Sequence, residues 1–130
     1  MAGETNLSTL LKNMTPVLND GDYVYCAVSA LNSIDTTQIA GLFKEDEGFT
    51  VILKKDLADQ LDLQYTYIAA WITLTIHSSL EATGLTAAFA TALAQENISC
   101  NVVAAYYHDH IFVAKHDAER AMLALRKLSE

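Results

Sequence analysis

The sequence Trp71-Ile-Thr-Leu-Thr-Ile-His77 begins the part of the chain that decides the fold. After it come Ser78-Ser-Leu-Glu-Ala-Thr-Gly84, then Leu85-Thr-Ala-Ala-Phe-Ala-Thr-Ala-Leu-Ala-Gln95, then the apolar runs Cys100–Tyr107 and Ile111–Lys115. In the first run aliphatic residues alternate with Trp and Thr, and a period of two is typical of a strand with two distinct faces. The run from Leu85 has apolar residues at helical spacing, enough to cover a sheet. The stretch therefore predicts strand, loop with glycine, helix, strand, tight turn and strand.

Composition and charge limit the classes of protein that this chain can belong to. It has 130 residues, 52% of them hydrophobic, so it can bury a sizeable core as one domain or as two small ones that share a core. No run approaches about 20 apolar residues, which excludes a membrane-spanning helix. The formal net charge of −8 argues against nucleic acid and anionic membranes as partners, because binding to either needs basic clusters.

The N-terminal residues and the two cysteines bear on the cellular compartment in which the protein is found. Met1-Ala-Gly-Glu-Thr-Asn6 is polar and has no basic region, so no secretory signal is predicted. Cys26 and Cys100 fall within predicted apolar strands, where we expect buried, reduced thiols. We therefore predict a cytoplasmic protein.

The rest of the chain gives shorter signals of secondary structure. We predict a first helix over Leu7–Met14 with Thr5 or Asn6 as its N-cap, and a helix that Asp56 caps. The last helix has an apolar stripe of Ala118, Ala121, Met122, Leu125 and Leu128. Strands are predicted over Tyr23–Ser29 and Phe49–Leu53, with a solvated turn at the acidic run 45–48. Residues 32–44 show no clear period.

A weak internal repeat relates the two halves of the chain. The segment Thr50–Asp56 corresponds to Ile111–Asp117, since each leads from a strand into a capped helix. Pairing Tyr23–Ser29 with Asn101–Tyr107, and the first helix with the Leu85 helix, gives both halves the order helix, strand, strand, helix. The repeat predicts two tandem α/β halves, residues 1–66 and 67–130, of which the first is the more degenerate.

The sequence from Trp71 onward resembles the ACT domain, a small βαββαβ module that senses amino acids. The resemblance rests on the loop glycine Gly84, the Ala-Leu-Ala centre of the following helix, and Ile98-Ser-Cys-Asn101 before the next strand. Together with Tyr106-Tyr-His-Asp-His-Ile-Phe-Val113, it is similar to a bacterial family of tandem ACT-like proteins. The resemblance implies an α+β fold of two ferredoxin-like halves, with an antiparallel sheet and helices on one face.

The resemblance also implies a site for a free amino acid at the loop–helix entrance, the point where residues 78–84 lead into the Leu85 helix. ACT domains hold their ligand at this loop, often across a dimer interface. The ligand-binding residues implied here are Ser79, Glu81, Thr83, Gly84, Leu85, Asn101 and Val102. The helix N-terminus suits a ligand carboxylate. Glu81 is placed to meet an ammonium group, and Asn101 to supply amide contacts.

Two residues of this site have a structural explanation of equal weight. Many ACT loops carry proline before the glycine, whereas this chain has Thr83, which can act as the helix N-cap without any ligand. Gly84 can likewise be explained by a strained turn that needs a glycine, with no ligand bound. Both readings stay open at the level of sequence.

The triplet His108-Asp109-His110 is the strongest candidate for metal chemistry. Two histidines at i and i+2 on a strand share a face and can reach one metal ion, but zinc needs at least three protein ligands. A two-residue hairpin turn at His108-Asp109 explains the triplet equally simply. His77-Ser78-Ser79 lacks the geometry of a nucleophile and base, because neighbours on a strand point to opposite faces. We predict no catalytic residues, no metal site and no cofactor.

Aromatic residues gather on the strand faces opposite the aliphatic residues. They are Trp71, Tyr23, Tyr25 and one of Tyr106 and Tyr107. Such a face is too apolar to be left in water, so we expect a homo-oligomer, a dimer or a tetramer. The alternative is that the segment 32–48 covers this face within one chain.

Three classes of function remain after these exclusions. The first is a non-enzymatic regulatory module that binds an amino acid. The second is a structural or oligomerisation protein that keeps the ACT-like fold and has no ligand. The third is a metal protein that depends on His108 and His110.

Overall fold

The computed structural model describes residues 6–75 and 84–130, and within these ranges it has two compact units. Unit 1 consists of residues 1–20 and 70–130, and unit 2 of residues 21–69. Unit 2 is therefore an insertion in the sequence of unit 1. The predicted halves 1–66 and 67–130 divide the chain at a different place, and they stay a prediction about the sequence repeat.

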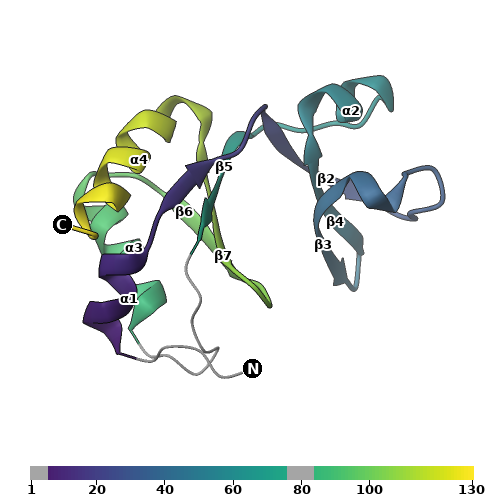
Figure 1. The fold of residues 1–130 in the computed structure, drawn as a ribbon. Coiled ribbons are helices and arrows are strands. Elements are labelled where there is room, and N and C mark those ends of the chain that lie inside the picture. Colours follow the sequence, from purple (N-terminus) through teal and green to yellow (C-terminus); the bar gives the residue numbers. More distant parts are fainter. Residues whose placement is uncertain (1–5, 76–83) are drawn as a thin grey trace. The chain divides into compact units, whose positions relative to one another are not determined.

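Unit 1 is an antiparallel sheet with helices on one face (Figure 1). Its strands, in spatial order, are β1 (Pro16–Leu18), β5 (Ile68–Leu74), β7 (Asp109–Ala114) and β6 (Cys100–Ala104). Its helices are α1 (Leu7–Asn13), α3 (Leu85–Gln95), η2 (Lys115–Asp117) and α4 (Ala118–Lys127). Val17 of β1 pairs with Thr73 of β5, and Val102 of β6 pairs with Ile111 of β7. The predicted arrangement of helices on one face is confirmed.

The core of unit 1 lies between this sheet and its helices. Period-two alternation directs Ile72 and Leu74 of β5 into the core, where Phe89 and Leu93 of α3 are fully buried. The predicted stripe of the last helix is confirmed, because Ala121, Met122 and Leu125 are buried in the same cluster. We call the face of the sheet that carries this core the helix face. The second face carries Trp71, Thr73, Asn101, Val103, His110 and Phe112.

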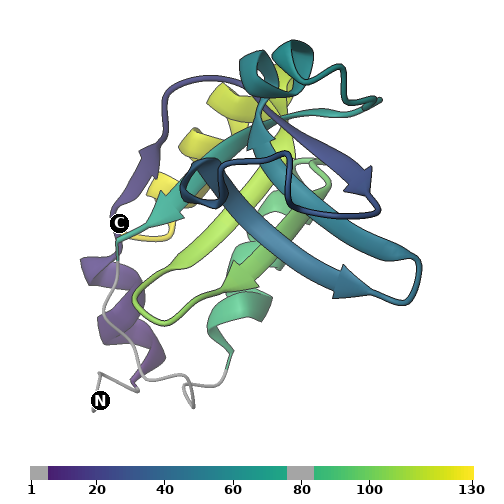
Figure 2. The ribbon, with the colours of Figure 1, turned by 90° about the vertical axis from the view of Figure 1, so that its right-hand side faces the viewer.

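Unit 2 has the same kind of sheet and a smaller core. Its elements are β2 (Tyr23–Val28), η1 (Thr36–Gln38), β3 (Ile39–Glu45), β4 (Gly48–Lys54) and α2 (Lys55–Gln60). The spatial order is β3, β4, β2 and then the first residues of β5, and the β3–β4 hairpin is seen along its length in Figure 2. As predicted, Val24 and Cys26 of β2 face the core, which Val51, Leu53 and Ala58 complete.

Both units follow the order strand, helical segment, strand, strand, helix, strand. In unit 2 these are β2, η1, β3, β4, α2 and the start of β5 along the chain; in unit 1 they are β5, α3, β6, β7 and α4, and β1, which precedes β5 in the sequence, takes the place of the last strand. The strand β5 thus ends one unit and begins the other. The predicted correspondence of β4–α2 with β7–α4 is confirmed. The pairing of β2 with β6 was wrong, because β2 corresponds to β5 and β6 to β3.

Two local predictions were wrong, and one segment without a prediction is explained by the structure. Tyr106 and Tyr107 are not strand residues but lie in the β6–β7 turn, which the bond from the Ala105 N–H to the His108 carbonyl closes (3.0 Å). Asp56 lies in the first turn of α2, whereas the N-cap is Lys54. The strand β3 lacked a sequence period because most of it is exposed and its register shifts between Ile39 and Gly41.

Two further observations concern compartment and membrane. Cys26 and Cys100 are free thiols, the first buried and the second half-buried. No helix among the described residues has the length and apolar character needed to cross a bilayer.

Candidate functional site

The N-terminus of α3 is the first feature of the candidate site. Gly84 is its N-cap, with φ 85° and ψ −10°, and as a glycine it has no side chain to cap the helix. The first intrahelical bond runs from the Ala88 N–H to the Gly84 carbonyl (2.9 Å), so the preceding N–H groups of the helix have no intrahelical partner. The first turn contains no acidic residue. The positive end of the helix dipole is therefore not neutralised by the helix itself.

Glycine at position 84 is required by the backbone and by a close neighbour. A φ of 85° lies in the left-handed region, which L side chains rarely adopt. An added Cβ would also lie 3.3 Å from Leu7 Cδ2 of α1. The sequence-based role of Gly84 as the residue between loop and helix is confirmed.

The structure brings only some of the predicted site residues together. Ser79, Glu81 and Thr83 lie outside the described residues. Leu85 is buried in the core on the helix face, and Val102 packs against the same core from β6. Asn101, the neighbour of Val102 in β6, pairs with Phe112 and lies on the second face of the sheet.

Asp109 is a residue that the sequence analysis missed. It opens β7 opposite Ala104, not in a turn, and only 8% of it is exposed. Ile111 and Val113 alternate with His110 and Phe112, which places Asp109 on the helix face. Burial raises the pKa of its carboxyl group, and the charge of His108 lowers it to a smaller extent. The spacing of Asp109, Ile111 and Val113 at every second residue was the sequence signal that Asp109 belongs to the strand and faces the helices.

On the second face a hydrogen-bond network holds the ring of His110. The Trp71 indole N–H donates to His110 Nδ1 (3.0 Å), and Thr73 Oγ1 lies 3.2 Å from the same atom. Asn19 Nδ2 donates to Thr73 Oγ1 (2.9 Å) and to the Trp71 carbonyl (3.1 Å). Because Nδ1 accepts the indole bond, the neutral ring carries its proton on Nε2. Burial, and secondarily the charge of His108, lower the pKa of His110.

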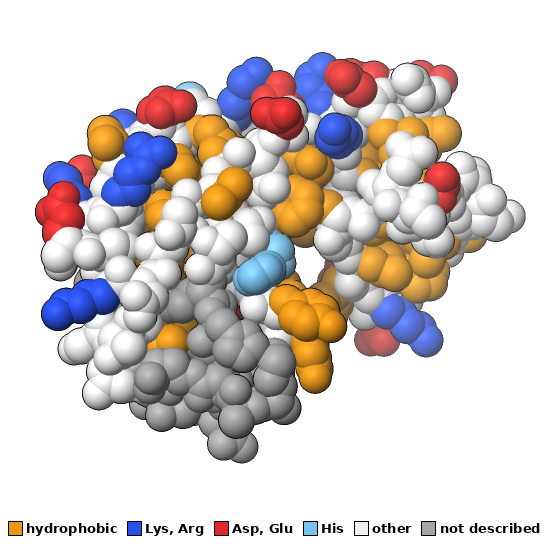
Figure 3. Space-filling view, viewed as in Figure 1, with side chains coloured by type: hydrophobic (Ala, Val, Ile, Leu, Met, Phe, Trp, Pro, Cys, Tyr) orange, Lys and Arg blue, Asp and Glu red, His pale blue; other side chains and the backbone are white. Residues whose placement is uncertain are grey.

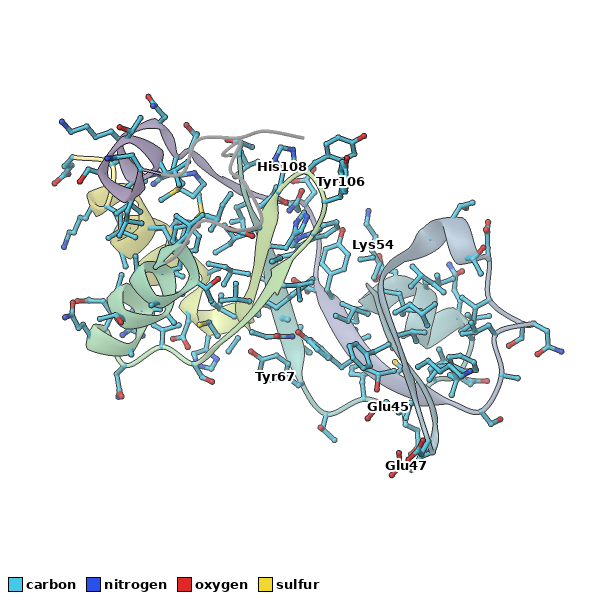
Figure 4. All side chains as sticks on the ribbon, turned by 90° about the horizontal axis from the view of Figure 1, so that it is seen from below. Glu45, Glu47, Lys54, Tyr67, Tyr106 and His108 are labelled. Atoms are coloured by element: carbon cyan, nitrogen blue, oxygen red, sulfur yellow. The ribbon has the colours of Figure 1, made fainter. Side chains whose placement is uncertain are left out.

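Among the described residues, no third ligand for a metal ion lies beside the histidine pair. The rings of His108 and His110 are 6.4 Å apart between centroids, and Asp109 between them lies on the helix face. Within residues 6–75 and 84–130, no group of three His, Cys, Asp or Glu side chains is placed to hold a metal ion. His108 lies beside Tyr106 at the tip of the β6–β7 hairpin (Figure 4). The predicted hairpin turn at His108-Asp109 was wrong, since the turn lies at 105–108.

Unit 2 has a shallow groove and a polar cluster of its own. The groove, of about 520 Å³, is lined by Tyr25, Ala27, Leu63, Gln64, Tyr65 and Thr66. The Tyr65 hydroxyl donates to Asp59 (2.7 Å), and Lys55 donates to the same carboxylate (2.9 Å). These two bonds, the Tyr65 bond first, lower the pKa of Asp59. Since the partners satisfy one another, this cluster stabilises the end of α2 and offers no group to a ligand.

The surface in Figure 3 shows hydrophobic side chains between the charged ones on both units. Among the described residues, Phe43, Tyr107 and Tyr106 are the large hydrophobic residues with the greatest exposure, at 71%, 67% and 63%. Phe43 belongs to β3 and the two tyrosines to the β6–β7 turn. The prediction that one of these tyrosines lies on a strand face was therefore wrong.

Comparisons with known proteins agree with this architecture. A family profile described as ACT domain matches residues 2–70, and a second ACT-domain profile matches residues 67–127. The comparison with curated proteins found no match. A crystal structure from Vibrio cholerae, titled a protein of unknown function and possible transport protein, is 47% identical, with a TM-score of 0.86 over 95% of this chain and 96% of that one.

Two more distant structures share the fold. A protein from Agrobacterium tumefaciens is 19% identical, with a TM-score of 0.66 over 89% of each chain. The regulatory subunit of aspartate kinase from Thermus thermophilus, in its ligand-free form, is 11% identical, with a TM-score of 0.68 over 88% of this chain and 96% of that one. At these identities the likeness concerns the fold alone.

Proposed function

Because this chain belongs to the ACT-domain family, we propose that it is a non-enzymatic regulatory module that binds a small molecule, and that the ligand is an amino acid. The proposed site is the loop–helix entrance of the C-terminal half, at the N-terminus of α3. Family membership supports the class of function. The local geometry of α3 supports the position of the site.

The observation that carries the proposal is the uncapped start of α3 at Gly84. The helix has 11 residues, its N-cap Gly84 has no side chain to cap it, and its first turn contains no acid. Unpaired N–H groups and the positive end of the dipole together favour an anionic group, and a ligand carboxylate supplies one.

The proposed contacts follow the placement of the residues. Ser79, Glu81 and Thr83 precede the helix and are assigned to the ligand from their position in the sequence. Leu85 and Val102 form apolar support on the helix face. Asn101 lies on the second face, so in our proposal it meets a ligand held by a second copy of the chain.

Assembly into a homo-oligomer, a dimer or a tetramer, is part of the proposal. The exposed aromatic side chains of β3 and of the β6–β7 turn support it, because water is an unfavourable environment for such groups. The free thiols of Cys26 and Cys100 support a cytoplasmic location, where thiols stay reduced.

A thermal-shift screen with the common L-amino acids tests the proposal. Ligand at about 100 times its dissociation constant adds about 2.7 kcal/mol to the free energy of unfolding. Gly84→Val is expected to abolish this response, because the new side chain strains the backbone and meets Leu7.

Gly21→Val is the matched control, since Gly21 also has a positive φ of 92° but lies in unit 2, at the turn before β2. It should lower the melting temperature and leave the response to ligand intact. A flat response of the native protein to every amino acid would favour the second candidate, an assembly protein, which the exposed Phe43 of β3 supports independently.

A further inference from the structure

The strand β2 is paired along its whole length on one side and only in part on the other. Its pairing with β4 covers all six of its residues, Tyr23–Val28. Its pairing with β5 covers only Tyr23 and Val24, because β5 begins at Ile68. Among the described strands, none lies beside the rest of β2 on this side. A strand edge of this kind presents backbone groups to which another strand can pair.

The backbone groups of Ala27 point towards this open edge. The Lys55 N–H donates to the Asp22 carbonyl (2.8 Å), which makes Asp22–Lys55 a hydrogen-bonded pair at the end of the β2–β4 ladder. Such pairs alternate along an antiparallel ladder, so Ala27 and Thr50 form a pair without hydrogen bonds. The N–H and C=O of Ala27 therefore face the β5 side. Among the described residues, no backbone hydrogen bond reaches them there.

A groove of about 520 Å³ lies where the β2–β5 ladder would continue. Continued pairing would place Tyr65 opposite Ala27, but residues 63–66 are not in a strand and line the groove instead, together with Tyr25. The Tyr65 hydroxyl is held by Asp59 (2.7 Å), so Tyr65 contributes only a fixed ring. Ala27 is exposed and has a small side chain. The groove thus has room for a side chain directly beside the open backbone groups.

A second hollow, of about 420 Å³, shares Ala27 with this groove and carries negative charge. Gly48 lines it with backbone only, because a Cβ there would lie 2.6 Å from the Val28 carbonyl oxygen. The exposed Glu45 and Glu47 also line it, and Figure 4 shows both at the same end of the β3–β4 hairpin. A cationic side chain is the group that such a hollow favours.

The charge of unit 2 favours a basic partner as well. Residues 21–69 contain eight acidic and three basic residues, which gives a formal net charge of −5. Lys54 and Lys55 lie at the end of β4, whereas the hollow lies at its start. Lys44 pairs with Phe49 and points to the opposite face of the sheet from its neighbour Glu45. None of the described residues that line the hollow is therefore basic.

We propose that the open edge of β2 binds an extended segment of a partner protein, which adds a strand at Ala27 and carries a lysine or arginine. The segment residue opposite Ala27 exchanges both backbone hydrogen bonds with it and places an apolar side chain in the groove. Two residues further along the segment, about 7 Å away, the basic side chain enters the hollow at Glu45 and Glu47. The proposal goes beyond amino-acid binding and does not depend on it, since it gives a regulatory module a surface for the protein that it regulates.

Fluorescence anisotropy with labelled pentapeptides tests the proposal on the full chain. The peptides carry valine, leucine, phenylalanine or tyrosine at the second position, lysine at the fourth and threonine elsewhere, with both ends blocked. At least one of them should bind, and its counterpart with glutamate at the fourth position should bind at least about tenfold more weakly. No binding by any lysine peptide up to about 1 mM, or equal binding by the glutamate peptides, would overturn the proposal.

N-methylation of the bound peptide tests strand pairing without any change to the protein. A methyl group on the nitrogen of the apolar residue removes the N–H that faces Ala27 and should abolish binding. A methyl group on the next threonine is the matched control, because that N–H points away from β2. If both methyl groups weaken binding equally, the segment does not pair with the strand and the proposal fails.

Hydrogen exchange of the Ala27 amide gives a direct readout of the same edge. The amide should exchange fast in the free chain and become protected when the lysine peptide is added. Protection in the free chain at every concentration would show that the chain itself covers the edge. Protection that grows with chain concentration would assign the edge to a second copy. Either result overturns the proposal.

Charge variants test the hollow. Glu45→Gln combined with Glu47→Gln should weaken binding of the lysine peptide by about threefold to tenfold, as expected for two exposed ion pairs. Asp46→Asn combined with Asp56→Asn removes the same charge from unit 2 outside the hollow and should leave the affinity unchanged. Equal weakening in the two double variants would show attraction by overall charge alone and overturn the proposal. Competition by lysine amide as effective as by the peptide would overturn it too, because the site would then take a small cation.

Discussion

The two units share one topology and differ at the position where a helix follows the first strand. In unit 2 that helical segment is η1, a single turn whose N-cap Asp35 accepts a hydrogen bond from the Thr37 N–H (3.0 Å). In unit 1 it is α3, with 11 residues and Gly84 at the N-cap. In unit 2 the N-cap residue thus supplies a carboxylate to the start of the helical segment, whereas the N-cap glycine of unit 1 has no side chain. Among the described residues, a capping carboxylate is therefore found at the start of this segment in unit 2 and not in unit 1.

A second difference concerns the first residues of the third strand. Aligning β4 with β7 places Gly48 of unit 2 where unit 1 has Asp109. A Cβ at Gly48 would lie 2.6 Å from the carbonyl oxygen of Val28, so the close approach of β2 excludes any side chain. Unit 2 therefore differs from unit 1 both in the N-cap of its first helical segment and in the first residue of this strand. We regard unit 1 as the unit that binds the amino acid.

The largest effect is expected from Phe89→Ala, which tests whether packing holds α3 in place. Phe89 is fully buried, and its removal should lower the free energy of unfolding by about 3–5 kcal/mol. Trp71 is the single tryptophan of the sequence and lies in unit 1, so denaturation followed by its fluorescence measures this loss. Leu123→Ala, at a residue of α4 that is 57% exposed, should change stability by less than about 0.5 kcal/mol.

A smaller effect is expected from Asp35→Ala, which removes the cap that distinguishes unit 2. The bonds of the Asp35 carboxylate with the Thr37 hydroxyl (2.7 Å) and N–H lower its pKa, so they favour its ionised form. Their loss should lower the melting temperature by a few degrees and leave any amino-acid response unchanged. An effect of Asp35→Ala on ligand affinity would contradict our assignment of binding to unit 1.

The smallest effect on stability is expected from the titration of His110. The hydrogen-bond network on the second face fixes the direction in which stability changes with pH. The pKa of His110 in the folded protein lies below the ordinary 6.5, because burial disfavours the charged ring. The unfolded chain therefore takes up the proton first, and unit 1 should lose stability as pH falls through about 6.5 towards the lowered value. Protonation of Nδ1 also removes the acceptor of the Trp71 indole N–H.

His110→Gln should flatten this pH dependence, since a glutamine carbonyl accepts the indole bond and does not titrate. Unfolding between about pH 5 and 8, followed by Trp71 fluorescence, measures it. His116→Gln is the matched control, because the His116 side chain is 83% exposed. If this control flattened the profile equally, the second-face network would not be the origin of the pH dependence.

The sequence was sufficient for the fold of unit 1 because its periods are clean. The period-two alternation correctly identified Ile72 and Leu74 as buried, and the helical spacing did the same for Leu85 and Leu93. Unit 2 was harder to predict, since β3 is mostly exposed and its register shift breaks the alternation. The use of β1 as the closing strand of unit 1 was not predictable, because a three-residue strand has no period of its own.

The candidate site was predictable only where it depends on the backbone. Gly84 could be recognised from its residue type, since few other residues tolerate its φ. Asn101 was assigned by position along the chain, and a single step in a strand separates the two faces of a sheet. Asp109 was assigned to a turn because the triplet His108-Asp109-His110 falls between two predicted strands, whereas Tyr106 and Tyr107 form that turn instead. The sequence thus indicated a turn between the two strands but did not fix its position.

The place of β1 in the sheet has a consequence for biosynthesis. Residues 16–18 leave the ribosome early, yet Pro16 and Val17 pair with Leu74 and Thr73, which are made more than 50 residues later. Unit 2 can form its own hydrogen bonds in this interval, whereas β1 cannot pair until β5 has been synthesised. We therefore expect a nascent chain that ends at Ala69 to contain an ordered unit 2 and an unpaired α1–β1 segment.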